Sequence, residues 1–129
     1  KTTLFHSLSF ADARAAIAFL EQVGFERRAL YWEDESAGVV AHAEYAWGRC
    51  GGLMFGSVRE SSPFARESGG GKCYLVVADD AEVDGVHARA LAAGAVSIQE
   101  PIDVDYGGRS AGFRDAEGNL YSVGSYPGS

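Results

Sequence analysis

The chain has 129 residues, of which 47% are hydrophobic and 22% are charged, and its formal net charge is −7. This size and composition are typical of one folded globular domain with a sizeable core, and they exclude a disordered chain. The negative charge argues against a nucleic-acid partner, because binding to a phosphate backbone depends on clustered Lys and Arg. No apolar run approaches the roughly 20 residues of a membrane span, so we expect no membrane partner.

The first half of the chain predicts a strand, a helix and three further strands. Residues 2–10 alternate loosely between polar and apolar types and indicate a strand, and the segment ADARAAIAFLEQVGFE then places apolar residues at helical spacing. Asp12 is the expected N-cap of this helix, and Gly24 is its expected stop. Three runs typical of strands follow, FERRALYWE, GVVAHAEYAW and GGLMFGSV, with hairpin-sized separators.

A polar stretch, RESSPFARESGGG, interrupts this order at residues 59–71 and predicts a linker that is flexible at its glycine end. Phe64 stands alone in it and is a candidate to close over a ligand. After the linker the order begins again. KCYLVVADDAEVDGVHARALAAGA predicts a strand and a helix, and AVSIQEP, RSAGFRD and NLYSVGSY predict three strands.

Each half therefore predicts strand, helix, strand, strand, strand. The expected fold is α+β, with two tandem βαβββ modules in one domain that spans residues 1–129. Residues 1–58 form the first module and residues 72–126 the second, joined by the linker 59–71. Because each module has one helix, we expect the modules to form a curved mixed sheet with helices outside and an inner cleft.

The two cysteines, Cys50 and Cys73, lack the close spacing of a metal site, and the first residues lack the pattern of a signal peptide. We therefore expect reduced thiols in a cytoplasmic protein. A chain of this length needs neither a disulfide nor a metal to fold.

The repeated half resembles the vicinal-oxygen-chelate superfamily, which includes glyoxalase I, extradiol dioxygenases and bleomycin-binding resistance proteins. The segments that carry the resemblance are ADARAAIAFLEQVGFE, AHAEYAWGRCGGLMFGS and YGGRSAGFRDAEGNLYSVGSY. The turn DAEGN at residues 115–119 is similar to the family's Asp-Pro-Asp-Gly-Asn hairpin, with Ala116 where proline is usual. Asp and Asn accept backbone hydrogen bonds in such turns, and Gly118 supplies a positive φ.

The resemblance implies a divalent metal held by one His or Glu from each of four strands. In this sequence the implied positions fall at Phe5, at Met54, at Lys72 or Cys73, and at Ser122. Phe, Met, Lys and Ser cannot assemble a site for a hard cation. We therefore expect no metal, no cofactor and no catalytic residue.

His42 and Glu44 lie two residues apart on one predicted strand, so they share a face. They are candidates for an acid/base pair or a partial metal site, or they lie on a polar surface. The competing function is a metal-dependent lyase, isomerase or transferase of the glyoxalase type, which would use His6, His42 and Glu44 in a rearranged site. His87, within the second predicted helix, is expected to be solvated.

Adjacent Tyr31 and Trp32 cannot both point inward on a regular strand, so one of them faces the cleft, a partner subunit or water. In the bleomycin-binding relatives, drug rings stack on aromatic side chains in grooves made by two subunits. By this resemblance, Trp32, Phe5 and Tyr106 are candidates for stacking, and Met54 is an adaptable floor.

Arg109, beside flexible glycines, is expected either to clamp a carboxylate or carbonyl of a ligand or to form a salt bridge with Asp105 or Glu117. The net charge of −7 mildly favours a cationic ligand, because negative potential attracts a cation.

The sequence therefore predicts a non-catalytic small-molecule-binding protein. Specifically, we expect an antibiotic-sequestering resistance protein of the bleomycin-resistance type, which acts as a homodimer on a flat aromatic or peptide antibiotic. A third possibility is a structural or regulatory module with a vestigial cleft. The expected ligand-binding residues are Phe5, Trp32, His42, Glu44, Met54, Tyr106, Arg109 and Ser122.

Overall fold

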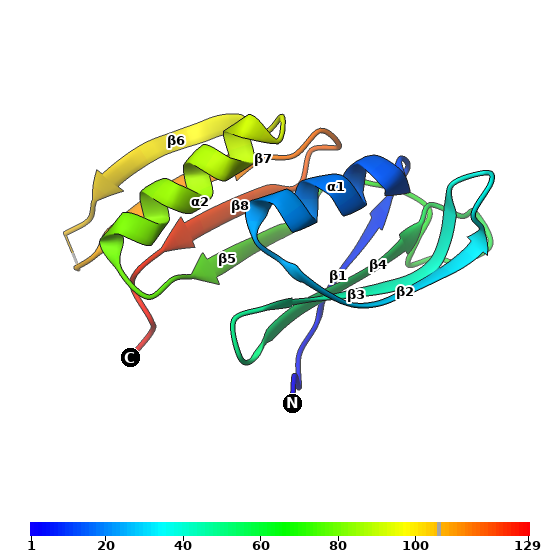
Figure 1. The fold of residues 1–129 in the computed structure, drawn as a ribbon, viewed down its shortest axis with the longest axis horizontal. Helices are drawn as coiled ribbons and strands as arrows, with labels where there is room; N and C mark the ends of the chain where they lie inside the picture. Colours follow the sequence, from blue (N-terminus) through cyan, green and yellow to red (C-terminus); the bar gives the residue numbers. More distant parts are fainter. Residues whose placement is uncertain (106) are drawn as a thin grey trace. The chain divides into compact units, whose positions relative to one another are not determined.

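The computed structural model describes residues 1–105 and 107–129, which contain two helices and eight strands (Figure 1). In chain order these are β1 (His6–Phe10), α1 (Ala13–Val23), β2 (Glu26–Asp34), β3 (Val39–Trp47), β4 (Gly51–Ser57), β5 (Lys72–Val76), α2 (Asp80–Ala92), β6 (Val96–Asp103), β7 (Arg109–Arg114) and β8 (Leu120–Gly124). The predicted α+β class and the repeated βαβββ order are therefore confirmed.

The chain divides into two compact units, Lys1–Gly71 and Lys72–Ser129. Each unit has a four-stranded mixed sheet, in the order β1-β4-β3-β2 in the first and β5-β8-β7-β6 in the second. In both units the first and last strands of the module pair in parallel, and the other neighbours pair antiparallel. The repeated sequence pattern thus corresponds to a repeated topology.

One helix covers one face of the first sheet. The Asp12 side chain caps α1 by accepting from the Ala15 backbone N–H at 3.1 Å, and Gly24 ends the helix with φ 128°, as the sequence predicts. The apolar side of α1 packs on the strand residues that alternate toward it. The buried residues of this core include Phe19, Leu20, Val23, Leu8, Phe10, Ala43, Tyr45, Leu53 and Phe55.

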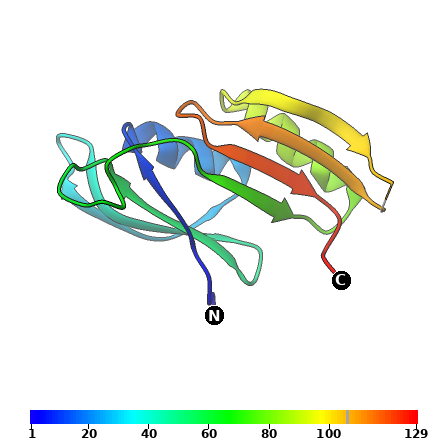
Figure 2. The same ribbon diagram turned by 180° about the vertical axis from the view of Figure 1, so that it is seen from behind.

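The second sheet is covered in the same way by α2, and Figure 2 shows its four strands in front of that helix. Val83, Val86 and Ala90 of α2 are buried together with Phe113 and Val123 of the strands. This burial provides the apolar core of the second unit.

The expectation that His87 is solvated is wrong, because α2 lies across β6 and β7 and this position faces the sheet. His87 is only 4% exposed, and its Nε2 lies 2.8 Å from the Ser97 Oγ of β6. Burial of an imidazole requires such a polar partner.

The DAEGN turn joins β7 to β8 through a buried carboxylate. Asp115 is 6% exposed and accepts hydrogen bonds from the backbone N–H groups of Glu117 and Asn119, both at 3.0 Å. Its second oxygen accepts from Asn119 Nδ2 at 3.0 Å and from the Tyr121 hydroxyl at 2.8 Å. Gly118 takes φ 100°, so the predicted side-chain bonding and positive φ are both confirmed.

The segment 59–71 belongs to the first unit. Its beginning folds back on itself, because the Arg59 N–H donates to the Ala65 carbonyl at 2.8 Å. Among the described residues, neither helix is long and apolar enough to cross a membrane.

Candidate ligand-binding faces

The face of the first sheet opposite α1 carries four of the expected ligand-binding residues. Met54 pairs with Glu44 and with Ser7 on the two neighbouring strands, so these side chains share a face. His42 lies two residues before Glu44 on β3, and Phe5 precedes β1 at the same side. The structure thus brings Phe5, His42, Glu44 and Met54 to one face.

His42 and Glu44 form a direct pair on this face. The Nε2 of His42 lies 2.8 Å from the Oε2 of Glu44, and the two side chains are 38% and 37% exposed. The ring of Tyr31 stacks on the imidazole, with 6.5 Å between ring centroids. An imidazole held by a carboxylate and open to solvent is able to exchange a proton with a bound ligand.

Two pockets open on this face of the first sheet. One has a volume of about 300 Å³ and is lined by Ser7, His42, Met54, Arg59 and Phe64, among others. The other has a volume of about 430 Å³ and includes Phe5 and Glu44 in its lining. Phe64 is 94% exposed at the edge of the first pocket, where its predicted closure over a ligand stays a prediction.

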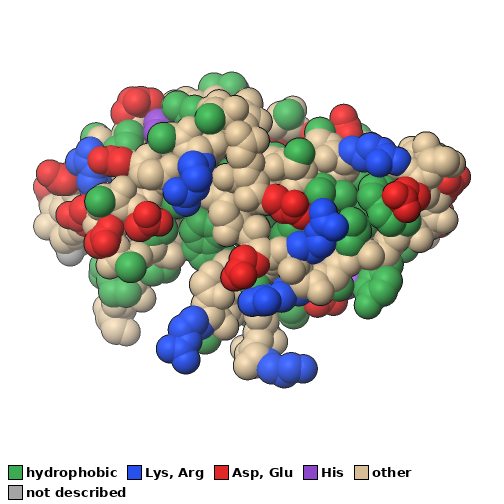
Figure 3. Space-filling view, in the orientation of Figure 1, with side chains coloured by type: hydrophobic (Ala, Val, Ile, Leu, Met, Phe, Trp, Pro, Cys, Tyr) green, Lys and Arg blue, Asp and Glu red, His purple; other side chains and the backbone are tan. Residues whose placement is uncertain are grey.

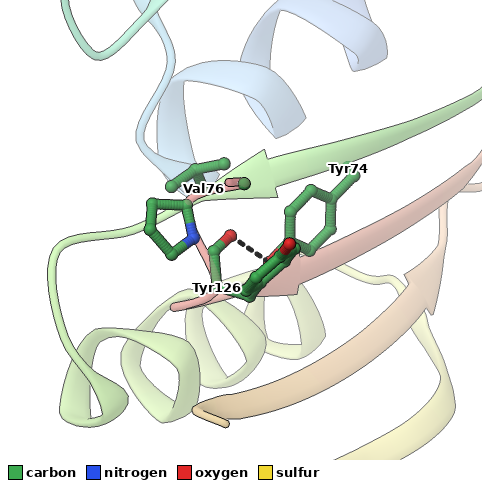
Figure 4. A pocket seen from close by; sticks show the side chains of 5 residues that line it. Tyr74, Val76 and Tyr126 are labelled. Atoms are coloured by element: carbon green, nitrogen blue, oxygen red, sulfur yellow. Dashed lines mark hydrogen bonds between the residues drawn. The ribbon is translucent and has the colours of Figure 1, made fainter. Parts of the chain in front are cut away.

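The corresponding face of the second sheet is more apolar. Ser122 pairs with Tyr74 and Gly112, and the exposed side chains Tyr74, Val76 and Leu120 lie on the same side. A pocket of about 390 Å³ is lined by Tyr74, Val76, Tyr126, Pro127 and Gly128 (Figure 4).

The hydroxyl of Tyr74 donates to the Tyr126 carbonyl at 2.8 Å. The ring of Tyr74 also lies so close to Gly124 that a Cβ at that position would clash with it. Tyr74 is not among the residues expected from the sequence to bind a ligand. Strand alternation places Tyr74 on the face opposite Cys73 and Leu75 of β5, and this pattern could have indicated its exposure.

Trp32 lies on the other face of the first sheet. The Arg14 guanidinium carbon of α1 is 5.0 Å from the centroid of its ring. Tyr31, which is 62% exposed, takes the open side in register with His42. The strand register shifts between Tyr31 and Trp32, so alternation alone did not determine which aromatic faced outward. The structure therefore does not bring Trp32 together with Phe5 and Met54.

Arg109 is held by two carboxylates on the α2 side of the second sheet. Its Nε lies 2.9 Å from Asp84 of α2, and its Nη1 lies 3.1 Å from Asp103 of β6. The expected partners Asp105 and Glu117 are wrong, because β7 directs this side chain toward the helix. Tyr106, the remaining aromatic candidate, lies outside the described residues.

The donor set does not fit a divalent metal. Phe5, Met54, Lys72 and Ser122 supply neither carboxylate nor imidazole, and Cys73 pairs with buried Tyr121 on the α2 side. Burial, with a smaller contribution from the charge of Asp115, raises the pKa of the Cys73 thiol to about 11. Over residues 1–105 and 107–129, no three His, Cys, Asp or Glu side chains group closely enough to hold a metal ion.

The alternative metal site built from His6, His42 and Glu44 is wrong. His6 pairs with Leu53, which is buried beneath α1, whereas His42 and Glu44 lie on the opposite face. Burial also lowers the pKa of His6. These three side chains therefore do not converge.

No protein-family model matches the sequence, and neither does any curated protein. Solved structures match it well. TioX from Micromonospora sp. ML1 is 25% identical with a TM-score of 0.73, and the alignment covers 96% of this chain and 98% of TioX. A lactoylglutathione lyase from Agrobacterium tumefaciens is 26% identical with a TM-score of 0.68, over 96% of this chain and 93% of the lyase.

A glyoxalase/bleomycin resistance protein/dioxygenase family enzyme from Burkholderia phytofirmans PsJN is 23% identical with a TM-score of 0.71, over 96% of this chain and 98% of that enzyme. The similarity therefore extends over both βαβββ modules, in agreement with the resemblance found in the sequence. The chain therefore has the fold of the glyoxalase/bleomycin resistance protein/dioxygenase superfamily, which is also called the vicinal-oxygen-chelate group.

Proposed function

We propose that this protein binds a small organic molecule without changing it, and that it sequesters an antibiotic in the manner of a bleomycin-resistance protein. The observation that carries the proposal is the chemistry of the open faces, by which we mean the sheet faces opposite α1 and α2. By the resemblance to the vicinal-oxygen-chelate superfamily, Phe5, Met54 and Ser122 stand at positions where the family's enzymes hold a metal. An aromatic ring and a thioether at such positions suit contact with a flat ligand better than metal coordination.

The surroundings of these residues support a flat ligand. The ring of Phe5 lies on the backbone of Gly52, where an added Cβ would be 2.9 Å from its Cε1 atom. Met54 adds apolar surface on the first sheet, and the Tyr74 pocket does so separately on the second. Each pocket, at about 300 to 430 Å³, is in the range of small-molecule sites. A flat aromatic or peptide antibiotic fits this chemistry.

We further propose that the protein acts as a homodimer. The second sheet exposes a set of large apolar side chains that a monomer would leave in water, and exposed patches of this kind mark interaction surfaces. They are Tyr74, Val76, Val96, Ile98, Ile102 and Leu120.

Sequestration protects a cell by lowering the concentration of free drug, so the affinity and the amount of protein decide its effect. Both cysteines are free, which suits the reducing cytoplasm where we expect the protein to act.

The test is calorimetric titration of a panel of aromatic peptide and glycopeptide antibiotics, followed by the mass of each recovered drug. We expect saturable binding of at least one drug, an unchanged mass, and growth protection that increases with expression. Met54→Lys places a charge on the open face and should weaken binding, whereas Ala88→Lys adds the same charge at an exposed position of α2 and should not. Failure of every drug to bind, or a changed drug mass, would contradict the proposal.

A second candidate is a metal-independent proton-transfer enzyme, which the His42–Glu44 hydrogen bond of 2.8 Å favours. In that case His42→Asn should abolish conversion of the ligand while the ligand still binds. If the NMR spectrum and the chromatographic retention of the recovered drug are unchanged after incubation with the unmodified protein, this candidate is excluded for that drug.

A further inference from the structure

The larger pocket of the first sheet has an unusual set of charges. Its lining includes the cations Lys1, Arg28 and Arg49 and one carboxylate, Glu44. Figure 3 shows Lys and Arg side chains around the N-terminal segment and the turn between β3 and β4, while Asp and Glu side chains gather around α2. In a chain with a net charge of −7, this pocket is locally positive.

The arginines of this pocket are less neutralised than three arginines elsewhere in the chain. Arg27, Arg59 and Arg109 each form an ion pair with N–O distances of 2.7 to 3.1 Å. Arg28 approaches its carboxylate, Glu26, only to 3.8 Å, and both side chains are more than half exposed. Such an exposed pair contributes little and is easily displaced.

Arg49 lies in the turn between β3 and β4, and within the described part of the chain it forms no ion pair. Its guanidinium is therefore available to a ligand. The one carboxylate of the pocket, Glu44, already accepts a hydrogen bond from His42. The cations thus outnumber the carboxylate, which is itself engaged.

The floor beside these cations is flat and apolar. The Phe5 ring lies on Gly52, and the partner of Gly52 on β3 is the small residue Ala46. A planar ring placed on Phe5 would carry its substituent toward the cationic rim of the same pocket. Guanidinium groups bind carboxylate and phosphate through paired N–H donors.

We propose that this pocket is an oxyanion subsite, in which Arg28 and Arg49 bind the carboxylate or phosphate of an aromatic ligand whose ring stacks on Phe5. The inference rests on the proposed small-molecule binding and adds the charge of the ligand to it. It also reverses the expectation, drawn from net charge alone, that the ligand is cationic.

The test compares three probes that share one ring system: 1-naphthoate, 1-naphthyl phosphate and the neutral 1-naphthamide. Amide NMR titration should show the largest shifts at Phe5, Ala46, Gly48 and Arg49. At least one anion should bind about tenfold more tightly than the amide, and this ratio should fall when NaCl is raised from about 50 to about 500 mM. The better anion identifies carboxylate or phosphate as the preferred group.

The Arg28→Gln, Arg49→Gln double variant should bring the affinity ratio of anion to amide close to one. Arg66→Gln, an exposed arginine of the 59–71 segment, is the matched control and should keep the ratio. Equal binding of the anions and the amide, shifts confined to other residues, or an unchanged ratio in the double variant would overturn the subsite.

The antibiotic titration and the comparison of naphthyl probes can fail independently of each other. If an antibiotic binds with unchanged mass but naphthoate and naphthyl phosphate show no advantage, the subsite fails and sequestration stands. If the anions show the advantage but no antibiotic binds, the subsite stands and antibiotic sequestration fails.

Discussion

The two cysteines illustrate how environment alone separates identical side chains. Cys50 is exposed in the turn between β3 and β4, whereas Cys73 is partly buried in β5 on the α2 side. Burial, and to a lesser degree the charge of Asp115, raises the pKa of Cys73 to about 11. The thiolate is the reactive form, so the two thiols should differ in reactivity.

We predict that a disulfide reagent at pH 8 modifies one thiol per chain rapidly and the second at least about tenfold more slowly, because a thiol with a pKa near 11 is almost entirely protonated there. Absorbance of the released thiolate follows both phases. Cys50→Ser should remove the rapid phase, and Cys73→Ser should leave it. Two equally rapid thiols in the native protein would contradict this assignment.

His6 makes the free energy of unfolding depend on pH, and its burial determines the sign of this dependence. Burial lowers its pKa from the ordinary value of 6.5, so between the lowered value and 6.5 the unfolded chain binds more protons than the folded one. The free energy of unfolding contributed by His6 is therefore fully present above pH 6.5 and is lost as pH falls through this window. His6→Gln should show a smaller loss of urea midpoint between pH 7.5 and 5.5 than the unmodified protein. An equal loss in both proteins would show that another group is responsible.

For single residues, the sequence predicted the secondary-structure element better than the direction of the side chain. The strand position of Trp32 was evident, but a register shift in β2 placed it beneath Arg14 and left Tyr31 outside. Likewise, His87 was expected to be solvated because it lies near Arg89 in the second predicted helix. Its burial depends on where α2 crosses β6, which is a tertiary property.

Individual elements follow more directly from local physical chemistry. The N-cap Asp12, the positive φ of Gly24 and the DAEGN turn all act within a few residues, so the sequence contained everything needed to predict them. The repeated order of elements then predicted the repeated sheet topology. What sequence did not indicate was the burial of Asp115, whose second oxygen serves Tyr121 in β8.

The β7–β8 hairpin should depend strongly on that carboxylate. Asp115→Ala removes the carboxylate that accepts from the buried Tyr121 hydroxyl and from Asn119 Nδ2, and loss of a hydrogen-bond partner by a buried group costs about 1 to 3 kcal/mol. We therefore predict a loss of about 3 kcal/mol or more in the free energy of unfolding, measured by urea titration. Glu67→Ala, at an exposed position of the 59–71 segment, should change it by less than about 0.5 kcal/mol. A similar small effect of both substitutions would show that water replaces the lost acceptor.

For the molecule as a whole, two properties reach beyond the single elements: its charge distribution and its apolar surface. Net charge suggested a cationic ligand, but the pairing of individual arginines, which sequence does not reveal, leaves one pocket positive. The apolar surface was also hidden in the sequence, because exposed Ile98 and Leu120 resemble ordinary core residues of a strand.

If the protein is a homodimer, the exposed apolar side chains of the second sheet should form its interface, and this can be tested by mutation. Ile98, Ile102 and Leu120 are 51%, 47% and 37% exposed, so lysine at these positions adds charge to the surface while leaving the core beneath α2 intact. Sedimentation velocity from about 1 to about 100 µM should show a dimer for the unmodified protein and a shift toward monomer for Ile98→Lys and Leu120→Lys. Ala88→Lys, on the exposed side of α2, should remain dimeric. If all three variants sediment like the unmodified protein, the second sheet does not form the interface, and a monomer at every concentration would contradict the homodimer itself.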